Sequence, residues 1–375
     1  MHTRPPPSGQ PPLPQIPADI GCALDYELLA PHFMAAPRFA YVAGGCGHDL
    51  TVAANRRAFD QWAMVPRLLR DVRQGHTRCS IAGQGFTHPL LLAPVAHQRL
   101  AHAQAERESA RAAAAMQACF VASTLSSVPL EEIAAHGGPQ RWFQLYLQPQ
   151  RADTLDLLAR AERAGYQAIV LTLDAAIQMA SRRALQAGFV MPPDCTPANL
   201  QGYGTAPLPQ LTHDASRIFQ GLMRQAATWE DLDWLLAHTR LPVWVKGVMH
   251  ADDARNLQAR GVAGIIVSNH GGRGLDGAPG TLAALPAVRA AVGPHYPVLL
   301  DGGVRSGSDV FKALALGAHG VLIGRLQVYA LAVAGALGVA HMLKALREEL
   351  EVCMALTGCV TLDDIHPGCL LPAQL

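Results

Sequence analysis

Eight short apolar segments, each followed by a helical pattern, constrain the fold of this chain more than any other feature. The segments are almost continuously hydrophobic, as expected for parallel strands that are covered on both faces. Eight strand–helix units in roughly 250 residues are typical of a closed (β/α)8 barrel of the TIM type, an α/β fold, and not of an open sheet. We expect the eight strands at residues 90–95, 119–123, 142–146, 168–173, 242–246, 264–268, 297–301 and 320–324.

Several stretches lie outside this repeat. Residues 18–89 precede the first strand and are expected to form helices and a small hairpin, and one or two closing helices are expected at 328–355. Residues 174–240 connect the fourth and fifth strands over a length that one helix does not require, which is typical of a lid or substrate loop. We therefore predict one barrel domain at 18–366, with a proline-rich disordered tail at 1–17 and a C-terminal tail at 367–375.

The bulk composition excludes several classes of function. Lys and Arg number 30 against 29 Asp and Glu, so no basic excess points to nucleic acid or to an anionic membrane. The N-terminus carries no secretory pattern, and no apolar run has the ~20 residues of a membrane span. The eight cysteines show no C-x-x-C pair and no zinc-ligand spacing. These features predict reduced thiols in a cytoplasmic protein with no metal site.

Polar and glycine residues gather where the predicted strands end. Because the carboxyl ends of barrel strands form the active-site face, we expect these residues to meet at one mouth of the barrel. A random surface loop would not collect a lysine, a histidine, two aspartates and several glycines at one register. The set comprises Ser123, Gln144, Tyr146, Thr172, Asp174, Lys246, Ser268, His270, Asp301, Gly302, Gly303, Gly324 and Arg325.

The segment Ser-Asn-His-Gly-Gly-Arg-Gly-Leu-Asp at 268–276 resembles the signature of the FMN-dependent 2-hydroxy-acid oxidases and dehydrogenases. Residues 299–307 and 318–325 resemble the phosphate-site motifs of that family, and the resemblance extends from about residue 20 to residue 366. It implies an FMN enzyme that oxidises a small (S)-2-hydroxy acid to the 2-oxo acid. It also implies a homotetramer or larger assembly, such as an octamer.

The resemblance implies a flavin site at the mouth of the barrel. Glycines let peptide N–H groups approach a phosphate and arginine supplies a cation, which is the usual use of the loops after strands seven and eight of such barrels. Lys246 is expected beside the flavin N1 and C2 carbonyl, where a cation stabilises the charge that hydride arrival leaves. The implied FMN contacts are Pro94, Ala96, Ser123, Gln144, Thr172, Lys246, Ser268, Asp301, Gly302, Gly303, Arg305, Gly324 and Arg325.

The same resemblance assigns the substrate chemistry. His270 is implied as the base that accepts the hydroxyl proton, which suits an imidazole because it titrates near neutral pH. Asp174 is implied as the partner that orients that imidazole. Arg273 offers a guanidinium fork for the substrate carboxylate, and Tyr41 and Tyr146 offer hydroxyl hydrogen bonds.

The sequence departs from the family pattern after the fourth strand. A gapless match places Ser181 where family members carry a second active-site arginine, and Arg182 takes that role only if the loop shifts by one residue. His97 and Leu125 also differ from the residues usual at their positions. These departures suggest a pocket reshaped for a non-standard 2-hydroxy acid.

Two other functions compete with 2-hydroxy-acid oxidation. One is a flavin barrel of another class, such as an isomerase, although such chemistry needs neither the base His270 nor the fork of Arg273. The other is a homologue that binds FMN without turnover, which the serine at position 181 keeps open. Whether dioxygen or another electron acceptor reoxidises the flavin does not follow from these residues, and we prefer dioxygen because no partner domain is visible.

Overall fold

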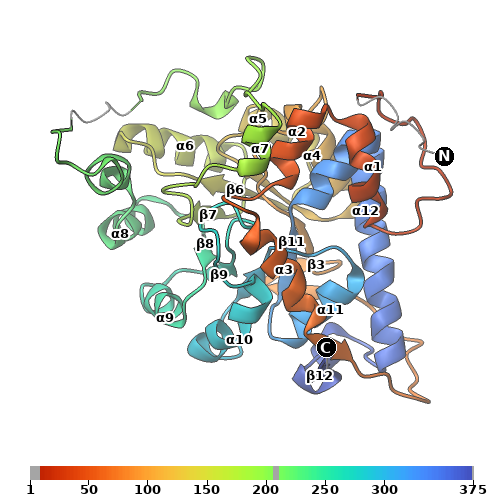
Figure 1. Cartoon of the computed structure of the whole chain (residues 1–375). Coiled ribbons are helices and arrows are strands. Elements are labelled where there is room, and N and C mark those ends of the chain that lie inside the picture. Colours follow the sequence, from red (N-terminus) through yellow and green to blue (C-terminus); the bar gives the residue numbers. More distant parts are fainter. Residues whose placement is uncertain (1–8, 206–210, 374–375) are drawn as a thin grey trace.

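A computed structural model of the chain describes residues 9–205 and 211–373. Eight parallel strands close into a barrel in the order β4 to β11, with β11 paired to β4, so the predicted (β/α)8 fold is confirmed. Figure 1 shows the strands surrounded by helices. The strands are β4 (Leu90–Leu92), β5 (Cys119–Ser123), β6 (Arg141–Leu145), β7 (Ile169–Thr172), β8 (Val243–Val248), β9 (Gly264–Val267), β10 (Val298–Leu300) and β11 (Gly320–Ile323).

One helix of the outer ring follows each strand. Aliphatic side chains from the strands and the inner faces of these helices form one continuous core between the two layers. The helices are α4 (Glu106–Met116), α5 (Leu130–His136), α6 (Arg151–Arg163), α8 (Trp229–His238), α9 (Ala251–Ala259), α10 (Thr281–Val292), α11 (Gly307–Ala315) and α12 (Arg325–Thr357).

A second, smaller core fills the inside of the barrel. Trp142 and Trp244 lie there with ring centroids 4.9 Å apart. A hairpin of β2 (Cys79–Ile81) and β3 (Gln84–Phe86) adds Ile81 and Phe86 to this core. Because Ile81 contacts the start of β11 at Gly320, the hairpin closes the amino-terminal end of the barrel. The opposite end, where the strands finish, is left for a site.

The N-terminal segment predicted at 18–89 forms α1 (Asp25–Phe33), α2 (Ala36–Ala43), α3 (Leu50–Asp60), the strand β1 (Trp62–Met64) and the hairpin. Residues 9–17 also belong to the fold, so the prediction of a disordered tail is wrong for them. The Leu13 N–H donates to the Val333 carbonyl at 2.7 Å, and Leu13 and Ile16 pack against the core. Residues 1–8 of that predicted tail lie outside the described residues.

Residues 367–373 of the predicted C-terminal tail are likewise part of the fold. The strand β12 (Leu370–Pro372) pairs antiparallel with β1, with Ala63 opposite Leu371. The backbone hydrogen bonds of this pair hold the last described residues in place. They also give partners to the backbone polar groups of β1. Residues 374–375 lie outside the described residues.

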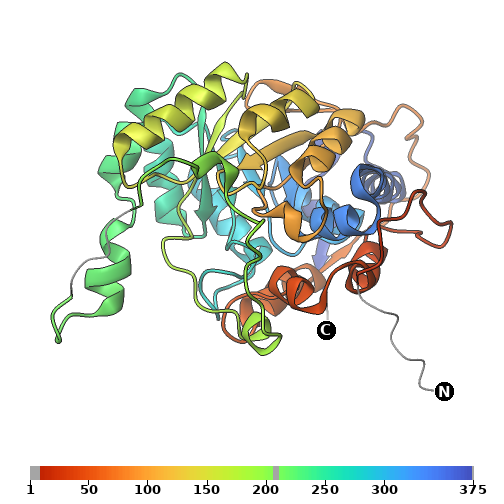
Figure 2. The same cartoon turned by 90° about the horizontal axis from the view of Figure 1, so that it is seen from above.

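The long connection after β7 contains α7 (Arg182–Gln186), η2 (Ala198–Leu200), η3 (Arg217–Gly221) and η4 (Leu222–Gln225) before the ring helix α8. Figure 2 shows part of this connection extending sideways from the barrel, while its first part crosses the mouth. The remaining elements are η1 (Gln98–Leu100), η5 (Leu362–Asp364) and η6 (Pro367–Cys369).

Within the described part of the chain, α12 has the length and apolarity to cross a bilayer, but 78% of its most apolar window is buried in the fold. Its backbone leaves helical geometry at Ala334 and Gly335, in agreement with the expectation of one or two closing helices. Its apolar residues pack against α1 and α4, so the apolar character of this helix is explained by the core.

Candidate active site

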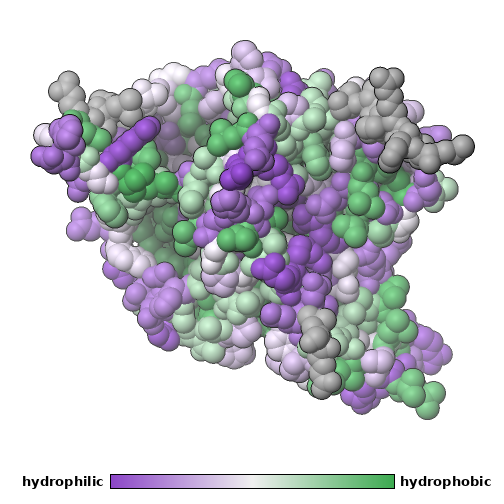
Figure 3. All heavy atoms as spheres, in the orientation of Figure 1, coloured by the Kyte–Doolittle hydropathy of each residue, from purple (hydrophilic) through white to green (hydrophobic). Residues whose placement is uncertain are grey.

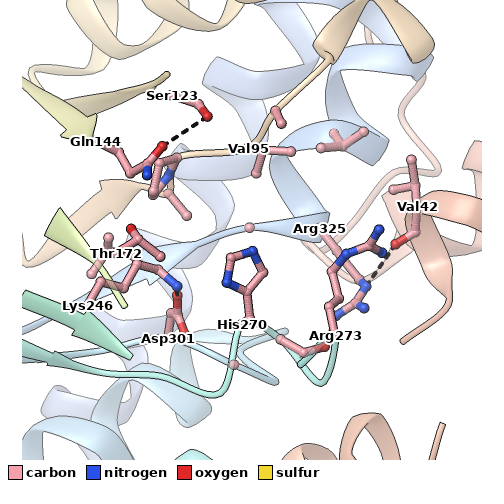
Figure 4. A pocket seen from close by; sticks show the side chains of 18 of the residues that line it. Val42, Val95, Ser123, Gln144, Thr172, Lys246, His270, Arg273, Asp301 and Arg325 are labelled. Carbon is pink, nitrogen blue, oxygen red and sulfur yellow. Dashed lines mark hydrogen bonds and ion pairs between the residues drawn. The ribbon is translucent and has the colours of Figure 1, made fainter. Parts of the chain in front are cut away.

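A pocket opens at the carboxyl ends of the strands, where the sequence predicts the site. Figure 4 shows His270 pointing into it between Lys246 and Thr172 on one side and Arg273 and Arg325 on the other. The predicted residues that line it are Tyr41, Pro94, Ala96, Ser123, Gln144, Tyr146, Thr172, Lys246, His270, Arg273, Asp301, Gly302, Gly303, Arg305, Gly324 and Arg325.

The loop after β9 aims His270 into this pocket. His270 has φ +57°, a left-handed conformation that costs a non-glycine residue ~1 kcal/mol and needs support from its surroundings. That support comes from α3, where the side chains of Asn55 and Asn269 exchange two hydrogen bonds of 2.8 and 2.9 Å. The amide pair is buried, so it fixes the loop in one position.

A chain of polar contacts runs behind the imidazole. The Nδ1 atom of His270 lies 2.8 Å from Oδ1 of Asp174. The Ser268 hydroxyl donates to the other Asp174 oxygen at 3.5 Å and accepts from Nζ of Lys246 at 2.6 Å. Nζ of Lys246 also lies 2.9 Å from Oδ2 of Asp301. One ammonium group therefore sits among two carboxylates and a hydroxyl in the buried floor of the pocket.

The protonation states of this chain follow from its surroundings. Burial alone would raise the pKa of Asp174, but the positive charge of Lys246 and the hydrogen bond with His270 outweigh it and lower the pKa to about 2. Burial would likewise lower the pKa of Lys246, yet Asp301 and Asp174 raise it. Asp174 is therefore a carboxylate and Lys246 an ammonium at neutral pH.

The rim of the pocket near α2 is built around Arg273. Its Nη1 atom donates to the carbonyls of Tyr41 and Gly44, each at 2.9 Å, and its guanidinium lies 4.7 Å from the centroid of the Tyr41 ring. The Tyr41 ring is stacked on Phe189 at a centroid distance of 4.3 Å. On the opposite wall, burial raises the pKa of Tyr146 to about 12, so its hydroxyl stays protonated. This end of the pocket offers a fixed cation and two phenols.

The other end is formed by the turns after β10 and β11. Gly303 has φ +89°, and a Cβ there would lie 2.7 Å from the Asn55 carbonyl, so only glycine fits. Arg305 forms a two-nitrogen ion pair with Glu27 of α1, and Arg325 donates to the carbonyls of Val42, Gly44 and Gly271. Protein acceptors hold both guanidinium groups in place. A phosphate would bind to these groups alongside the protein partners.

The residues present fit a flavin. Among the described residues, buried polar atoms without a hydrogen-bond partner include Nε2 of Gln144 and Oγ1 of Thr172, and both residues line the pocket. Buried polar groups are rarely left unpaired, so these atoms call for a polar ligand edge. The Ser123 hydroxyl donates to Oε1 of Gln144 at 3.1 Å, which turns the amide nitrogen of Gln144 toward the pocket (Figure 4).

Besides Asp174, which lies behind His270, two predicted site residues do not line the pocket. Arg182 is exposed and does not line the pocket, because α7 begins there and Ser181 is its N-cap, accepting from the Ala184 N–H. The one-residue loop shift that would bring Arg182 into the place of the missing arginine is not present, so its expected role in substrate binding is not supported by this arrangement. Ser268 is fully buried behind the pocket wall, so it positions Lys246 and His270 and does not reach the cofactor space as predicted.

Three useful residues did not emerge from the sequence. Asn55 lies in α3, and nothing in that segment of sequence reveals its partner Asn269. Glu27 pairs with Arg305 across 278 positions of sequence, a contact without a local signal. Gln178 lines the pocket mouth from the loop after β7, where the sequence departs from the family pattern.

Comparison with known proteins places the chain in a family. The family model described as FMN-dependent dehydrogenase matches residues 30–372. An L-lactate oxidase of Alicycliphilus denitrificans is 67% identical over 359 residues, 96% of this chain and 98% of that protein. Glycolate oxidase 1 of Zea mays is 40% identical, covering 92% of this chain and 94% of its own.

A solved structure of mandelate oxidase with (S)-2-phenylpropionate superimposes with a TM-score of 0.84 at 40% identity, covering 94% of this chain and 98% of its own. The predicted cofactor, FMN, and the predicted reaction class agree with these relatives, and the competing barrel functions are not favoured. The chain belongs to the family of FMN-dependent 2-hydroxy-acid oxidases and dehydrogenases.

Proposed function

We propose that this enzyme oxidises a small (S)-2-hydroxy acid of the lactate class to the 2-oxo acid, with His270 as the base and dioxygen as the final electron acceptor. The contact that carries the proposal is the 2.8 Å approach of His270 Nδ1 to the Asp174 carboxylate, at the wall of a pocket that also holds Arg273 and Lys246. The high identity to an L-lactate oxidase supports the lactate class.

The geometry supports Nε2 of His270 as the nitrogen that acts as the base. Asp174 is ionised, so it only accepts hydrogen bonds, and the proton between the two residues belongs to Nδ1 of the imidazole. In the neutral imidazole Nε2 then carries no proton, and it would accept the proton of the substrate hydroxyl. The carboxylate afterwards stabilises the imidazolium that forms.

The substrate carboxylate is assigned to Arg273. Because Nη1 of its guanidinium is tied to two backbone carbonyls, the group is held in place before a substrate arrives. The hydroxyls of Tyr41 and Tyr146 complete the anion site as donors. The Tyr146 phenol stays protonated because burial raises its pKa to about 12.

FMN would lie between these groups and the glycine turns. Gln144 and Thr172 would meet its polar edge, Lys246 would face it as a buried cation, and Gly302, Gly303 and Gly324 would let peptide N–H groups approach its phosphate. When bound, FMN supplies the acceptor for the hydride that leaves the substrate α-carbon. The ammonium of Lys246 favours any negative charge that builds up beside it.

Assembly and location are part of the proposal. Leu68, Leu69, Leu356 and Leu371 are 58–104% exposed, and the Arg67 N–H bonded to the Leu356 carbonyl brings the first three together. Figure 3 shows hydrophobic residues at this corner, at the lower right. Exposed apolar patches of this kind are typical of subunit interfaces, which supports a homo-oligomer. The even charge balance suits a cytoplasmic enzyme.

The test is anaerobic mixing of the yellow FMN enzyme with L-lactate, D-lactate, glycolate and L-mandelate. Bleaching of the flavin by L-lactate but not by D-lactate, followed by peroxide release on adding oxygen, is the expected result. Bleaching without peroxide, with reoxidation only by a quinone or dye, would refute dioxygen as acceptor. No bleaching by any acid in a fully FMN-loaded sample would refute the reaction.

A further inference from the structure

A pair of thiols lies outside the pocket lining, near the C-terminal end of the described chain. Sγ of Cys359 lies 4.0 Å from Sγ of Cys369, and all eight cysteines of the chain are free thiols. Both sulfur atoms point at the same acceptor, the Asp364 carbonyl, at 3.5 and 3.7 Å. A disulfide needs a sulfur separation of ~2.05 Å, which rotation about the two Cα–Cβ bonds can approach from 4.0 Å.

The two thiols close one structural unit, residues 359–373, here named the C-terminal clasp. Cys359 follows the end of α12, where its N–H donates to the Met354 carbonyl. Cys369 precedes β12, and its carbonyl accepts from Val65 at 2.9 Å. The clasp thus joins α12 to β1, the strand directly after α3.

We propose that Cys359 and Cys369 are a modification site, a dithiol that hydrogen peroxide converts into a reversible disulfide. Cys369 is partly exposed and Cys359 is only 4% exposed, so peroxide reaches Cys369 first. Burial also raises the pKa of the Cys359 thiol, which keeps it protonated until the second step.

The disulfide forms in two steps. The sulfur of Cys369 attacks one peroxide oxygen, the O–O bond breaks, and a sulfenic acid and one water form. The sulfur of Cys359 then displaces the sulfenic oxygen, the S–O bond breaks, and a disulfide and a second water form. Two thiols lose two electrons and two protons, and one peroxide becomes two waters. A thiol reductant reverses the change.

Closure would brace the support of the active site without touching it. The clasp holds β1 and therefore the end of α3, whose Asn55 fixes the His270 loop. A cross-link over this short loop constrains the unfolded chain, so the oxidised protein is expected to unfold about 3 °C higher. Turnover is expected to stay unchanged, because neither thiol lines the pocket.

The test treats the FMN-loaded enzyme with hydrogen peroxide and then measures its intact mass and free thiols. No Lys or Arg follows Arg347, so trypsin leaves Cys353, Cys359 and Cys369 in one peptide, whereas cleavage after acidic residues separates Cys369 at Asp363 and Asp364. In the Cys353→Ser variant, linked peptides can then arise only from the proposed pair or from a more distant cysteine.

The expected result is the loss of two hydrogens and two thiols in the wild type and in Cys353→Ser, with the peptides on either side of Asp364 linked. Cys369→Ser, a change at a partly exposed position, should abolish the link, and so should Cys359→Ala. The proposal is overturned if peroxide only adds oxygen atoms with no linked peptides, or if two thiols are still lost in Cys369→Ser.

Discussion

Replacing Asp174 by asparagine tests the central contact of the active site. The asparagine keeps the size of the side chain but removes the charge that lies 2.8 Å from His270. Its amide can also donate to Nδ1, which would place the imidazole proton on Nε2, the atom that has to accept the substrate proton. Both effects act on the imidazolium formed during the reaction.

The size of the effect follows from the geometry. Two unit charges ~4 Å apart in an environment of effective dielectric ~20 attract by ~4 kcal/mol. Because ~1.36 kcal/mol corresponds to a factor of ten in rate, losing this attraction slows the reductive step by roughly 10³. The KM for the substrate should change much less, because Asp174 does not line the pocket.

Anaerobic stopped-flow measurement of flavin bleaching isolates this step from reoxidation. Asp253→Asn, which removes an exposed carboxylate on α9, is the charge-matched control and should bleach at the wild-type rate. FMN content must be measured in parallel, because Asp174 also supports Lys246. A fully loaded Asp174→Asn enzyme that bleaches within tenfold of the wild type would refute the role assigned to the His270–Asp174 pair.

Three further outcomes are expected. Arg182→Ala should leave KM unchanged, whereas Arg273→Lys should raise it at least tenfold, since only Arg273 lines the pocket; equal effects on KM would contradict this. Gly324→Ala should keep the unfolding temperature of the FMN-free protein, because a Cβ there meets open space, yet weaken FMN binding tenfold or more in a fluorescence titration; unchanged affinity would remove Gly324 from the phosphate site. The pKa of Asp174 is lowered from 3.8 to about 2, so its ionised form should contribute ~2 kcal/mol of folding stability above about pH 4, and this contribution is lost as the pH falls to about 2. The difference in unfolding free energy between the wild type and Asp174→Asn should therefore shrink in acid denaturation experiments. A difference that stays constant would contradict the ion pairing.

The barrel could be predicted because its signal is local and repeated. Each strand is visible in the sequence as a short apolar run, and all eight predicted runs overlap a strand of the barrel. The two tails could not be assigned in this way. Leu13 and Ile16 lie in a proline-rich segment whose composition is typical of a disordered tail. Their packing against the core depends on contacts with distant residues, which the local sequence does not reveal. The strand β12 is three residues long, and its pairing with β1 spans most of the chain.

The site could be predicted to the extent that register alone decides it. Thr172 ends β7 and pairs in register with Lys246 near the end of β8, so the barrel geometry brings them together without further information. Loops are different, because their side chains are placed by contacts and not by periodicity. Ser181 became a helix cap and Arg182 a surface residue, an outcome fixed by where α7 begins.

The partners of the cations in the pocket are the part of the site that the sequence does not predict. Each cation has its counterpart within the protein: Asp301 for Lys246, Glu27 for Arg305, and backbone carbonyls for Arg273 and Arg325. The cations are visible at strand ends and in motifs, but three of these four counterparts come from α1 and the segment around α2, more than 200 residues away. Because the partners hold the charges in place before any ligand binds, an anionic cofactor and substrate meet an arranged field and not flexible side chains. The N-terminal helices are therefore part of the active site, although they contribute only Tyr41 and Val42 to its lining.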